Sequence, residues 1–181
     1  MDVQQLADEL AEVRSRLAAL EDEKEIRELL ARYGYYADAK LDDEYYDLFT
    51  DDCVMDVSTG RGDDPYALLR WEGLAAMREF MAVRTAGNGD GFYGRSLHMQ
   101  GNNVAIRVSG DAAVATNYSF IFHQDGPDLR IISASINAWQ LVRTEAGWRI
   151  RQRRRRMVGA PDTAEVLRAT DRDVRASASG A

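Results

Sequence analysis

The sequence predicts an α+β fold, with helices packed on one face of a curved antiparallel sheet. Up to about residue 86, apolar residues recur in helical steps of three and four. After that point the chain reads as long strands rich in β-branched and aromatic residues, joined by turn-like connectors. Helices first and consecutive strands after are typical of α+β proteins. With 181 residues and no internal repeat, one main domain accounts for the length.

The helical half is predicted from its apolar spacing and from capping residues. An apolar stripe predicts a first helix over residues 3–20. The acidic run Glu21-Asp22-Glu23 suits the positive end of a helix dipole, so a second helix is expected from there to about Lys40. A short third helix follows Asp42 and Asp43, then a strand over Cys53–Val57. The last helix of this half runs from about Gly73 to Arg84.

The second half predicts four long strands. They are Ser96–Ser109, Ala112–His123, Leu129–Thr144 and Trp148–Val158. The expected organisation is an N-terminal helix over 1–20, a main domain over 21–160, and a C-terminal helix with a frayed tail over 161–181.

Composition excludes several classes of function. Apolar residues make up 45% and charged residues 29%, which argues against wholesale disorder. The net charge of −7 argues against a nucleic-acid partner, because phosphate contacts need a basic surface. A single cysteine, Cys53, cannot build a Cys-only zinc site, and we expect no metal. The glycine-rich stretch over residues 86–94 lacks the preceding strand and following helix of a dinucleotide site, so we expect no cofactor.

The sequence also indicates where in the cell the protein is expected. No apolar run approaches the roughly 18 residues that span a bilayer, so no membrane partner is expected. The N-terminus is acidic and amphipathic and has neither the basic start nor the apolar middle of a signal peptide. We therefore expect a cytoplasmic protein that acts on a small molecule.

Three residues are candidates for acid–base chemistry. The two histidines, His98 and His123, each lie in an apolar strand context, where a hydrogen-bonded core imidazole is the common alternative. Asp38 lies near the end of the second helix, where it opposes the helix dipole without an obvious gain in stability; the alternative is a solvated carboxylate. A carboxylate beside an imidazole fixes the tautomer of the ring and raises its basicity, which is the arrangement of a general base.

The last strand carries an unusual run of arginines, WRIRQRRRRMV. A nucleic-acid patch is one interpretation, and the negative net charge disfavours it. Period-two alternation places Gln152, Arg154 and Arg156 on one face of the strand and the other arginines on the opposite face. One face should meet acidic helices or a neighbouring subunit, and the other could give one arginine to the cavity to hold an anionic or carbonyl substrate. We expect Arg154 or Arg156 in the cavity; a β-bulge would reverse this parity.

The segment EIRELLARYGYYADAKLDDEYYDLFTDDCVMDV resembles the opening of the SnoaL-like branch of the NTF2-like superfamily. The strands RSLHMQGNNVAIRV, AAVATNYSFIFHQDG and INAWQLVRTEAGWRI continue the resemblance in order, over about residues 22–158. Members of this branch include scytalone dehydratase, bile-acid 7α-dehydratase and hexachlorocyclohexane dehydrochlorinase. The resemblance implies a conical barrel, but one fold hosts many chemistries.

Residue by residue, the resemblance implies a site. Asp38 and His98 match the catalytic dyad, in which the histidine is the general base. Tyr33 matches a cavity tyrosine, His123 a second cavity histidine and Asn137 a substrate-holding asparagine.

The chain also departs from the pattern. It has Lys40 and Leu41 where scytalone dehydratase has a water-orienting Tyr and an Asp, so a water-assisted mechanism does not carry over. The resemblance is closer to the enzymes in which histidine removes a proton and a leaving group departs.

Together these observations predict a cofactor-free lyase of the dehydratase or elimination type, acting on a small polycyclic, aromatic or steroid-like substrate. Tyr33 and Tyr36 would polarise the acceptor oxygen, and His123 or an arginine would assist the leaving group. Two alternative functions remain: an isomerase or cyclase that uses the same base, and a non-catalytic binding or assembly module.

The resembling lyases are trimers, so the resemblance implies a homotrimer, with a dimer as the alternative. The dyad predicts Asp38 and His98 within about 2.6–3.2 Å of each other.

Overall fold

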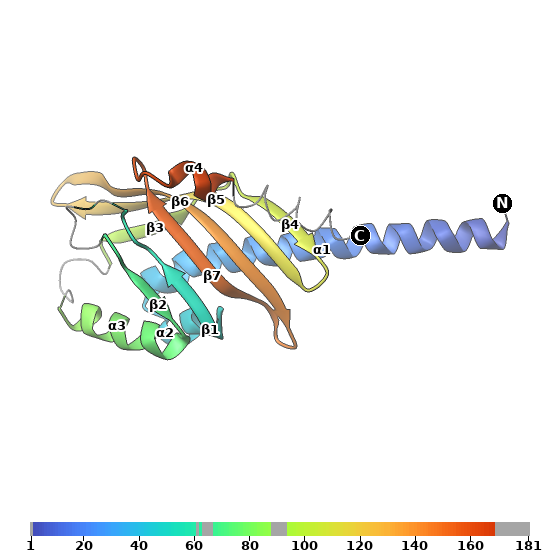
Figure 1. The fold of residues 1–181 in the computed structure, drawn as a ribbon, viewed down its shortest axis with the longest axis horizontal. Coiled ribbons are helices and arrows are strands. Elements are labelled where there is room, and N and C mark those ends of the chain that lie inside the picture. The colour runs from blue at the N-terminus through green and yellow to red at the C-terminus, as the bar shows by residue number, and fades with distance from the viewer. Residues whose placement is uncertain (1, 61, 63–66, 88–93, 169–181) are drawn as a thin grey trace.

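The computed structural model describes residues 2–60, 62, 67–87 and 94–168 of the chain. Its described elements, in order, are α1 (Val3–Ala39), α2 (Asp42–Tyr46), β1 (Phe49–Asp56), β2 (Arg70–Glu72), α3 (Leu74–Gly87), β3 (Ser96–Gln100), β4 (Ala105–Ser109), β5 (Ala112–Asp125), β6 (Asp128–Thr144), β7 (Gly147–Met157) and α4 (Thr163–Leu167). Helices precede the long strands, as the sequence predicts, and the α+β class is confirmed (Figure 1).

The two N-terminal helices expected from the sequence are one continuous helix, so the separate start at Glu21 was wrong. Neither glycine nor proline interrupts residues 3–33, and acidic side chains are as well solvated within an exposed helix as at its first turn. The helix begins with a capping box between Asp2 and Gln5. It ends at Lys40, which takes the left-handed conformation with φ 56°.

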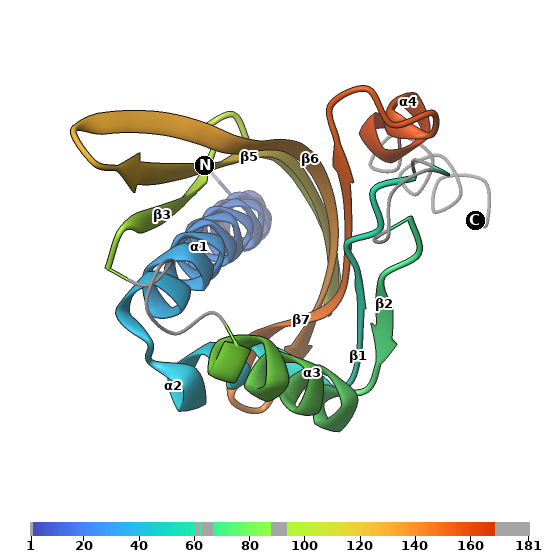
Figure 2. The same ribbon diagram turned by 90° about the vertical axis from the view of Figure 1, so that its left-hand side faces the viewer.

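The strands form one sheet in the order β2-β1-β7-β6-β5-β3, with β4 also paired to β5. The sheet is mixed rather than wholly antiparallel, because β1 runs parallel to its neighbour β7. It curls around α1, which lies along its concave face, while α4 lies on the other side of β7 (Figure 2). This arrangement places the C-terminal part of α1 opposite the inward-facing residues of β3, β5, β6 and β7.

Two local expectations needed correction. The strand expected over residues 96–109 is divided into β3 and β4, because the chain turns at Gly101. A Cβ at Gly101 would lie 2.8 Å from the Tyr118 carbonyl oxygen, so this approach requires glycine. The short strand β2 gave no signal of its own in the sequence. The expected frayed tail lies outside the described residues, although α4 provides the expected C-terminal helix.

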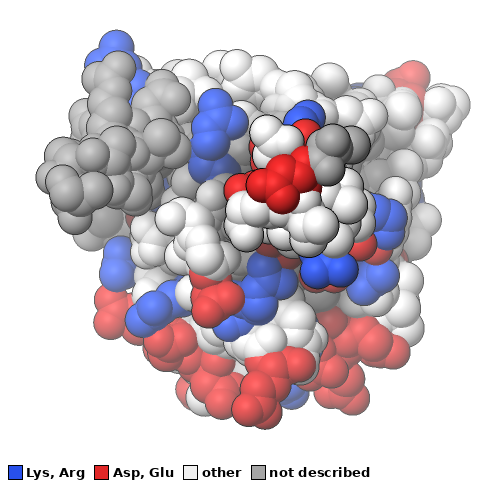
Figure 3. Space-filling view, turned by 90° about the vertical axis from the view of Figure 1, so that its right-hand side faces the viewer, with Lys and Arg blue, Asp and Glu red and all other residues white. Residues whose placement is uncertain are grey.

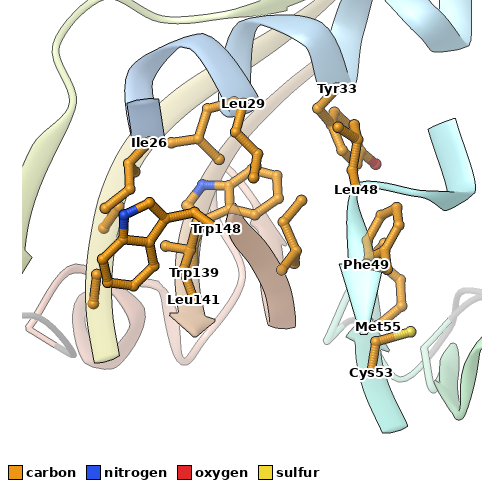
Figure 4. Close-up of a cluster of buried hydrophobic side chains, with 14 of the residues drawn as sticks. Ile26, Leu29, Tyr33, Leu48, Phe49, Cys53, Met55, Trp139, Leu141 and Trp148 are labelled. Atoms are coloured by element: carbon orange, nitrogen blue, oxygen red, sulfur yellow. The ribbon is translucent and has the colours of Figure 1, made fainter. Parts of the chain in front are cut away.

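The hydrophobic core lies between α1 and the sheet. Ile26 and Leu29 of α1 pack over Trp139 and Trp148 of β6 and β7, and Ile150 is fully buried (Figure 4). The second indole is also tied to the helix, because Trp148 Nε1 donates to Asp22 at 3.2 Å. These contacts fix α1 against β6 and β7. None of the described helices is both long and apolar enough to cross a bilayer.

Candidate active site

A cavity of about 430 Å³ lies between the curved sheet and the helices α1, α2 and α3. This size is within the range of small-molecule sites, which is roughly 300–1,000 Å³. Much of the wall is apolar, with contributions from Met55, Val57, Leu69, Trp71, Met77, Met81, Ile121, Ile132 and Met157. The polar side chains that line it include Tyr33, His98, Gln100, Ser119, Arg153 and Arg155. An apolar chamber with a few polar groups suits a largely hydrophobic ligand that carries one or two oxygens.

Asp38 and His98 meet at the edge of this cavity. Asp38 Oδ1 lies 2.6 Å from His98 Nδ1, and Asp38 Oδ2 accepts the backbone N–H of His98 at 2.8 Å. The distance lies within the range expected for the dyad. An ionised carboxylate only accepts hydrogen bonds, so Nδ1 donates in this contact, and in the neutral ring the lone pair is then on Nε2. Both side chains are largely buried, with 18% and 23% exposure for Asp38 and His98.

A glycine brings the two residues of the dyad together. Gly34 lies one helical turn before Asp38, on the same face of α1. A Cβ at Gly34 would lie only 2.2 Å from the His98 carbonyl oxygen, so α1 and β3 touch backbone to backbone there. This approach lets the short Asp38 side chain reach both the ring and the main chain of His98.

Gly34→Ala should therefore destabilise the protein, although alanine is the better helix former by about 1 kcal/mol. The added methyl must push α1 away from β3, and such overpacking costs about 1–3 kcal/mol. We expect a net loss of unfolding free energy, measured by denaturant titration. The control is Gly62→Ala, where the added methyl meets no described residue within 4 Å. A Gly34→Ala protein at least as stable as the wild type would contradict the close approach.

The wall of the cavity contains a buried arginine held from two sides. Arg153 donates to Asn137 Oδ1 from Nε at 3.0 Å and from Nη2 at 2.7 Å. Its Nη1 donates to the Tyr33 hydroxyl, and its guanidinium lies over the rings of Tyr33 and Trp139. Asn137 also donates to Ser119 Oγ at 2.9 Å. The result is a rigid polar network within an otherwise aromatic environment.

Tyr33 lines the cavity together with Arg153 and Ser119 of this network. Its ring lies 5.1 Å from that of Tyr45 and 5.3 Å from that of Trp139. Burial raises the pKa of Tyr45 well above its ordinary value, and a hydrogen bond with Tyr33 adds to this. Tyr45 therefore stays a neutral phenol. Because the Tyr33 oxygen accepts from Arg153, the Tyr33 hydroxyl is a polarised donor.

The prediction that Arg154 or Arg156 enters the cavity was wrong by one position along the strand. Arg153 and Arg155 line the cavity, whereas Arg154 and Arg156 do not. The cause is a bulge at Arg151, which has no partner in the register: Gln140 pairs with Gln152, and Leu141 pairs with Ile150. Before the bulge the inward-facing residues are Trp148 and Ile150, at even-numbered positions. After the bulge they are Arg153 and Arg155, at odd-numbered positions.

Arg154 and Arg156 instead join β7 to α4 and β1. Arg156 donates twice to Asp56, at 2.9 and 2.8 Å, and once to Asp162 at 2.7 Å. Arg154 donates to Asp162 and Glu165. Burial opposes the charge of Asp56, but hydrogen bonds from Arg156 and Ser58 outweigh it and lower the pKa of this carboxyl. Arg154 and Arg156 therefore make the acidic contacts that the sequence analysis assigned to the opposite face of the strand.

The remaining candidate residues lie beside the cavity rather than in its lining. His123 is on the same face of the sheet as His98, but its Nδ1 lies 2.8 Å from the Ser96 hydroxyl. Asn137 is fully buried behind the wall, where it positions Arg153 and Ser119. Tyr36 is half-buried and packs against the core, and its carbonyl accepts the N–H of Leu41.

Sequence reasoning missed several lining residues, among them Gln100, Ser119, Tyr45, Arg153 and Arg155. Period-two alternation from His98 marks Gln100, because β3 is regular. No comparable signal marks Arg153, whose position depends on the bulge. Among the described residues, no three His, Cys, Asp or Glu side chains gather in a way that could hold a metal ion.

Comparisons with known proteins agree on the fold. The model of a family described as "SnoaL-like domain" matches residues 18–154. No curated protein matches the sequence significantly.

A solved NTF2-like protein with a cystatin-like fold from Novosphingobium aromaticivorans is 29% identical. The match covers 92% of this chain and 97% of that one, with a TM-score of 0.71. A second protein from that species, named as a candidate aromatic ring hydroxylase, is 25% identical over 77% and 90% of the chains (TM-score 0.61). A third, named as a candidate scytalone dehydratase, is 19% identical over 81% and 88% (TM-score 0.61), which shows the fold alone.

Proposed function

Because the chain belongs to the SnoaL-like domain family, we propose that it is a cofactor-free lyase of the elimination type. The observation that carries the proposal is the contact between Asp38 and His98 at the cavity. It supports a general base on carbon. The largely apolar lining of the cavity suits the proposed substrate class, a small polycyclic, aromatic or steroid-like compound.

The proposed reaction begins at His98. Its Nε2 takes a proton from a carbon made acidic by a neighbouring oxygen function, and the electrons of the broken C–H bond form a double bond as the leaving group departs. The imidazolium that results is stabilised by the carboxylate of Asp38, which already accepts the Nδ1 proton. Return of the proton from His98 to the leaving group or to water restores the base.

Tyr33 would stabilise the charge that develops on the substrate oxygen. Its hydroxyl is polarised by Arg153, and its side chain is buried against the rings of Tyr45 and Trp139. A preorganised donor in such an environment stabilises an oxyanion more strongly than water does. Arg155, which also lines the cavity, would assist the departing anion. Arg155 thereby takes the role that the sequence suggested for Arg154 or Arg156.

The proton transfer can be tested without knowing the natural substrate. The protein is incubated in D2O with a panel of cyclic ketones, phenols and hydroxylated or halogenated ring compounds, and products are followed by NMR and mass spectrometry. We expect deuterium to enter one carbon of a binding compound, with loss of water or halide, and neither change with His98→Ala. Exchange that persists in His98→Ala would contradict the proposed base.

The same assay distinguishes the lyase from the alternative functions. A product that keeps the mass of its substrate, apart from deuterium, indicates the isomerase or cyclase. A compound that binds without exchange or loss indicates a binding module. A cavity plugged by side chains, or Asp38 and His98 far apart, would support a non-catalytic binding or assembly module; here the cavity is unfilled and the dyad is in contact. Both observations support the enzyme.

We further propose that the protein acts as a homo-oligomer, with a trimer favoured over a dimer. The outer face of the sheet exposes large apolar side chains, including Leu97, Met99 and Tyr118. Exposed apolar patches of this kind are typical of subunit contacts. Light scattering at micromolar concentration measures the mass directly.

A further inference from the structure

The N-terminal half of α1 extends beyond the domain (Figure 1). It carries a row of six large apolar side chains, each 48–83% exposed: Val3, Leu6, Leu10, Val13, Leu17 and Leu20. Such a row on a solvent-exposed helix is unusual for a monomer, because it leaves a continuous apolar surface in water. Figure 3 looks at the molecule from the side on which this helix projects, and charged side chains of both signs lie around it.

The spacing of the row differs from that of the core-facing part of the same helix. The steps are three, four, three, four and three, which place Val3, Leu10 and Leu17 at heptad position a and the other three at position d. The two positions that continue this spacing are Lys24 and Arg27, so the row ends where the helix reaches the domain. A repeat of 3.5 residues matches a left-handed supercoil of helices. The sheet of the same chain does not cover this row.

We infer that residues 3–20 form a parallel coiled coil with the same segment of another copy of this chain. The charges beside the row favour this partner and this orientation. In a parallel pair, position g of one helix faces position e of the next heptad of the other. Glu9 then faces the partner's Arg14, and Arg16 faces the partner's Glu21. By symmetry, a two-helix assembly has four such attractive contacts.

The antiparallel arrangement is less favourable. With Leu10 opposite the partner's Val13, Glu9 faces the partner's Arg16, which is attractive. Asp2 then faces the partner's Glu23, which is repulsive. The charge pattern thus distinguishes the two orientations, and it would be unnecessary if the row met an unrelated apolar partner. Residues 169–181 are a poor alternative cover, because Val174 is their only large aliphatic residue.

The test uses the full chain and two matched variants. Leu10→Glu with Leu17→Glu places two charges in the row, whereas Ala11→Glu with Ala18→Glu places the same charges at position b, one residue along. We expect sedimentation analysis to give a multiple of 20.3 kDa for the wild type and the control. The variant Leu10→Glu with Leu17→Glu should dissociate at a protein concentration about tenfold or more above that of the wild type, because charges between the packed helices are costly. A monomeric wild type, or equal dissociation of the two variants, would overturn the inference.

Orientation is tested by a single cysteine. In Leu6→Cys the new thiols of a parallel pair face each other and should form an intermolecular disulfide under mild oxidation. In the antiparallel arrangement residue 6 faces residue 17 of the partner, so the thiols lie roughly 16 Å apart at 1.5 Å per residue, too far to bridge. The natural Cys53 is 1% exposed and serves as the background. If the wild type is an oligomer and Leu6→Cys forms no such disulfide, the parallel orientation is overturned.

Discussion

His98→Ala is expected to lower kcat by roughly 10²–10⁴-fold, the usual contribution of a general base, while the protein folds normally. The substitution removes a cavity-lining imidazole that is in contact with a carboxylate. It leaves the backbone N–H of residue 98 bonded to Asp38 Oδ2. Turnover is measured with the substrate identified by deuterium exchange, and circular dichroism checks the fold.

Asp38→Asn should lose activity by a different route. The asparagine oxygen can accept the backbone N–H of His98, which turns the amide NH2 toward Nδ1. Nδ1 must then accept, the ring proton moves to Nε2, and the base is lost. His123→Ala is the comparison, because this second histidine contacts Ser96 and is not among the lining residues. It should lose far less activity than either dyad variant; near-full turnover by both dyad variants would refute the lyase proposal.

The second large effect is expected on stability. Asp56→Asn should lower the free energy of unfolding by about 3 kcal/mol at neutral pH, because it leaves the charge of Arg156 buried and only partly paired. The two side chains are 10% and 8% exposed. The control is Asp52→Asn on the same strand, whose partner Arg151 is exposed, so a change below about 1 kcal/mol is expected.

The pH dependence of this effect follows from the direction of the pKa shift. The pKa of Asp56 is lowered in the folded protein, so the unfolded chain binds the proton more readily. The stabilisation is therefore present above the ordinary carboxyl pKa of about 3.9 and is lost as the pH falls through the lower folded value. Denaturant titrations of wild type and Asp56→Asn should converge under acid conditions. A constant difference down to pH 2 would contradict the assignment.

Local sequence patterns determined a large part of this protein. The fold class, the helical character of the first half and the long strands β5, β6 and β7 with the turns between them follow from apolar periodicity and turn residues, because these signals are short-range. The same signals did not show that residues 3–39 form one helix or that the strand expected over 96–109 divides into β3 and β4. The pair Asp38 and His98 could be named from the family resemblance, and its geometry is as expected. The apolar row over residues 3–20 was also visible, although its spacing alone did not show that the sheet would leave it uncovered.

Only the tertiary structure decided which arginine enters the cavity. A single unpaired residue, Arg151, reverses the parity of β7, and a bulge depends on pairing with β6 rather than on the sequence of β7 itself. The same holds for Gly34, whose role depends on how closely β3 approaches α1. Asn137 and His123 were placed outside the cavity lining for a similar reason: their partners, Arg153 and Ser96, come from other strands. Spacing along one segment determines a face, whereas the contacts between segments determine what that face meets.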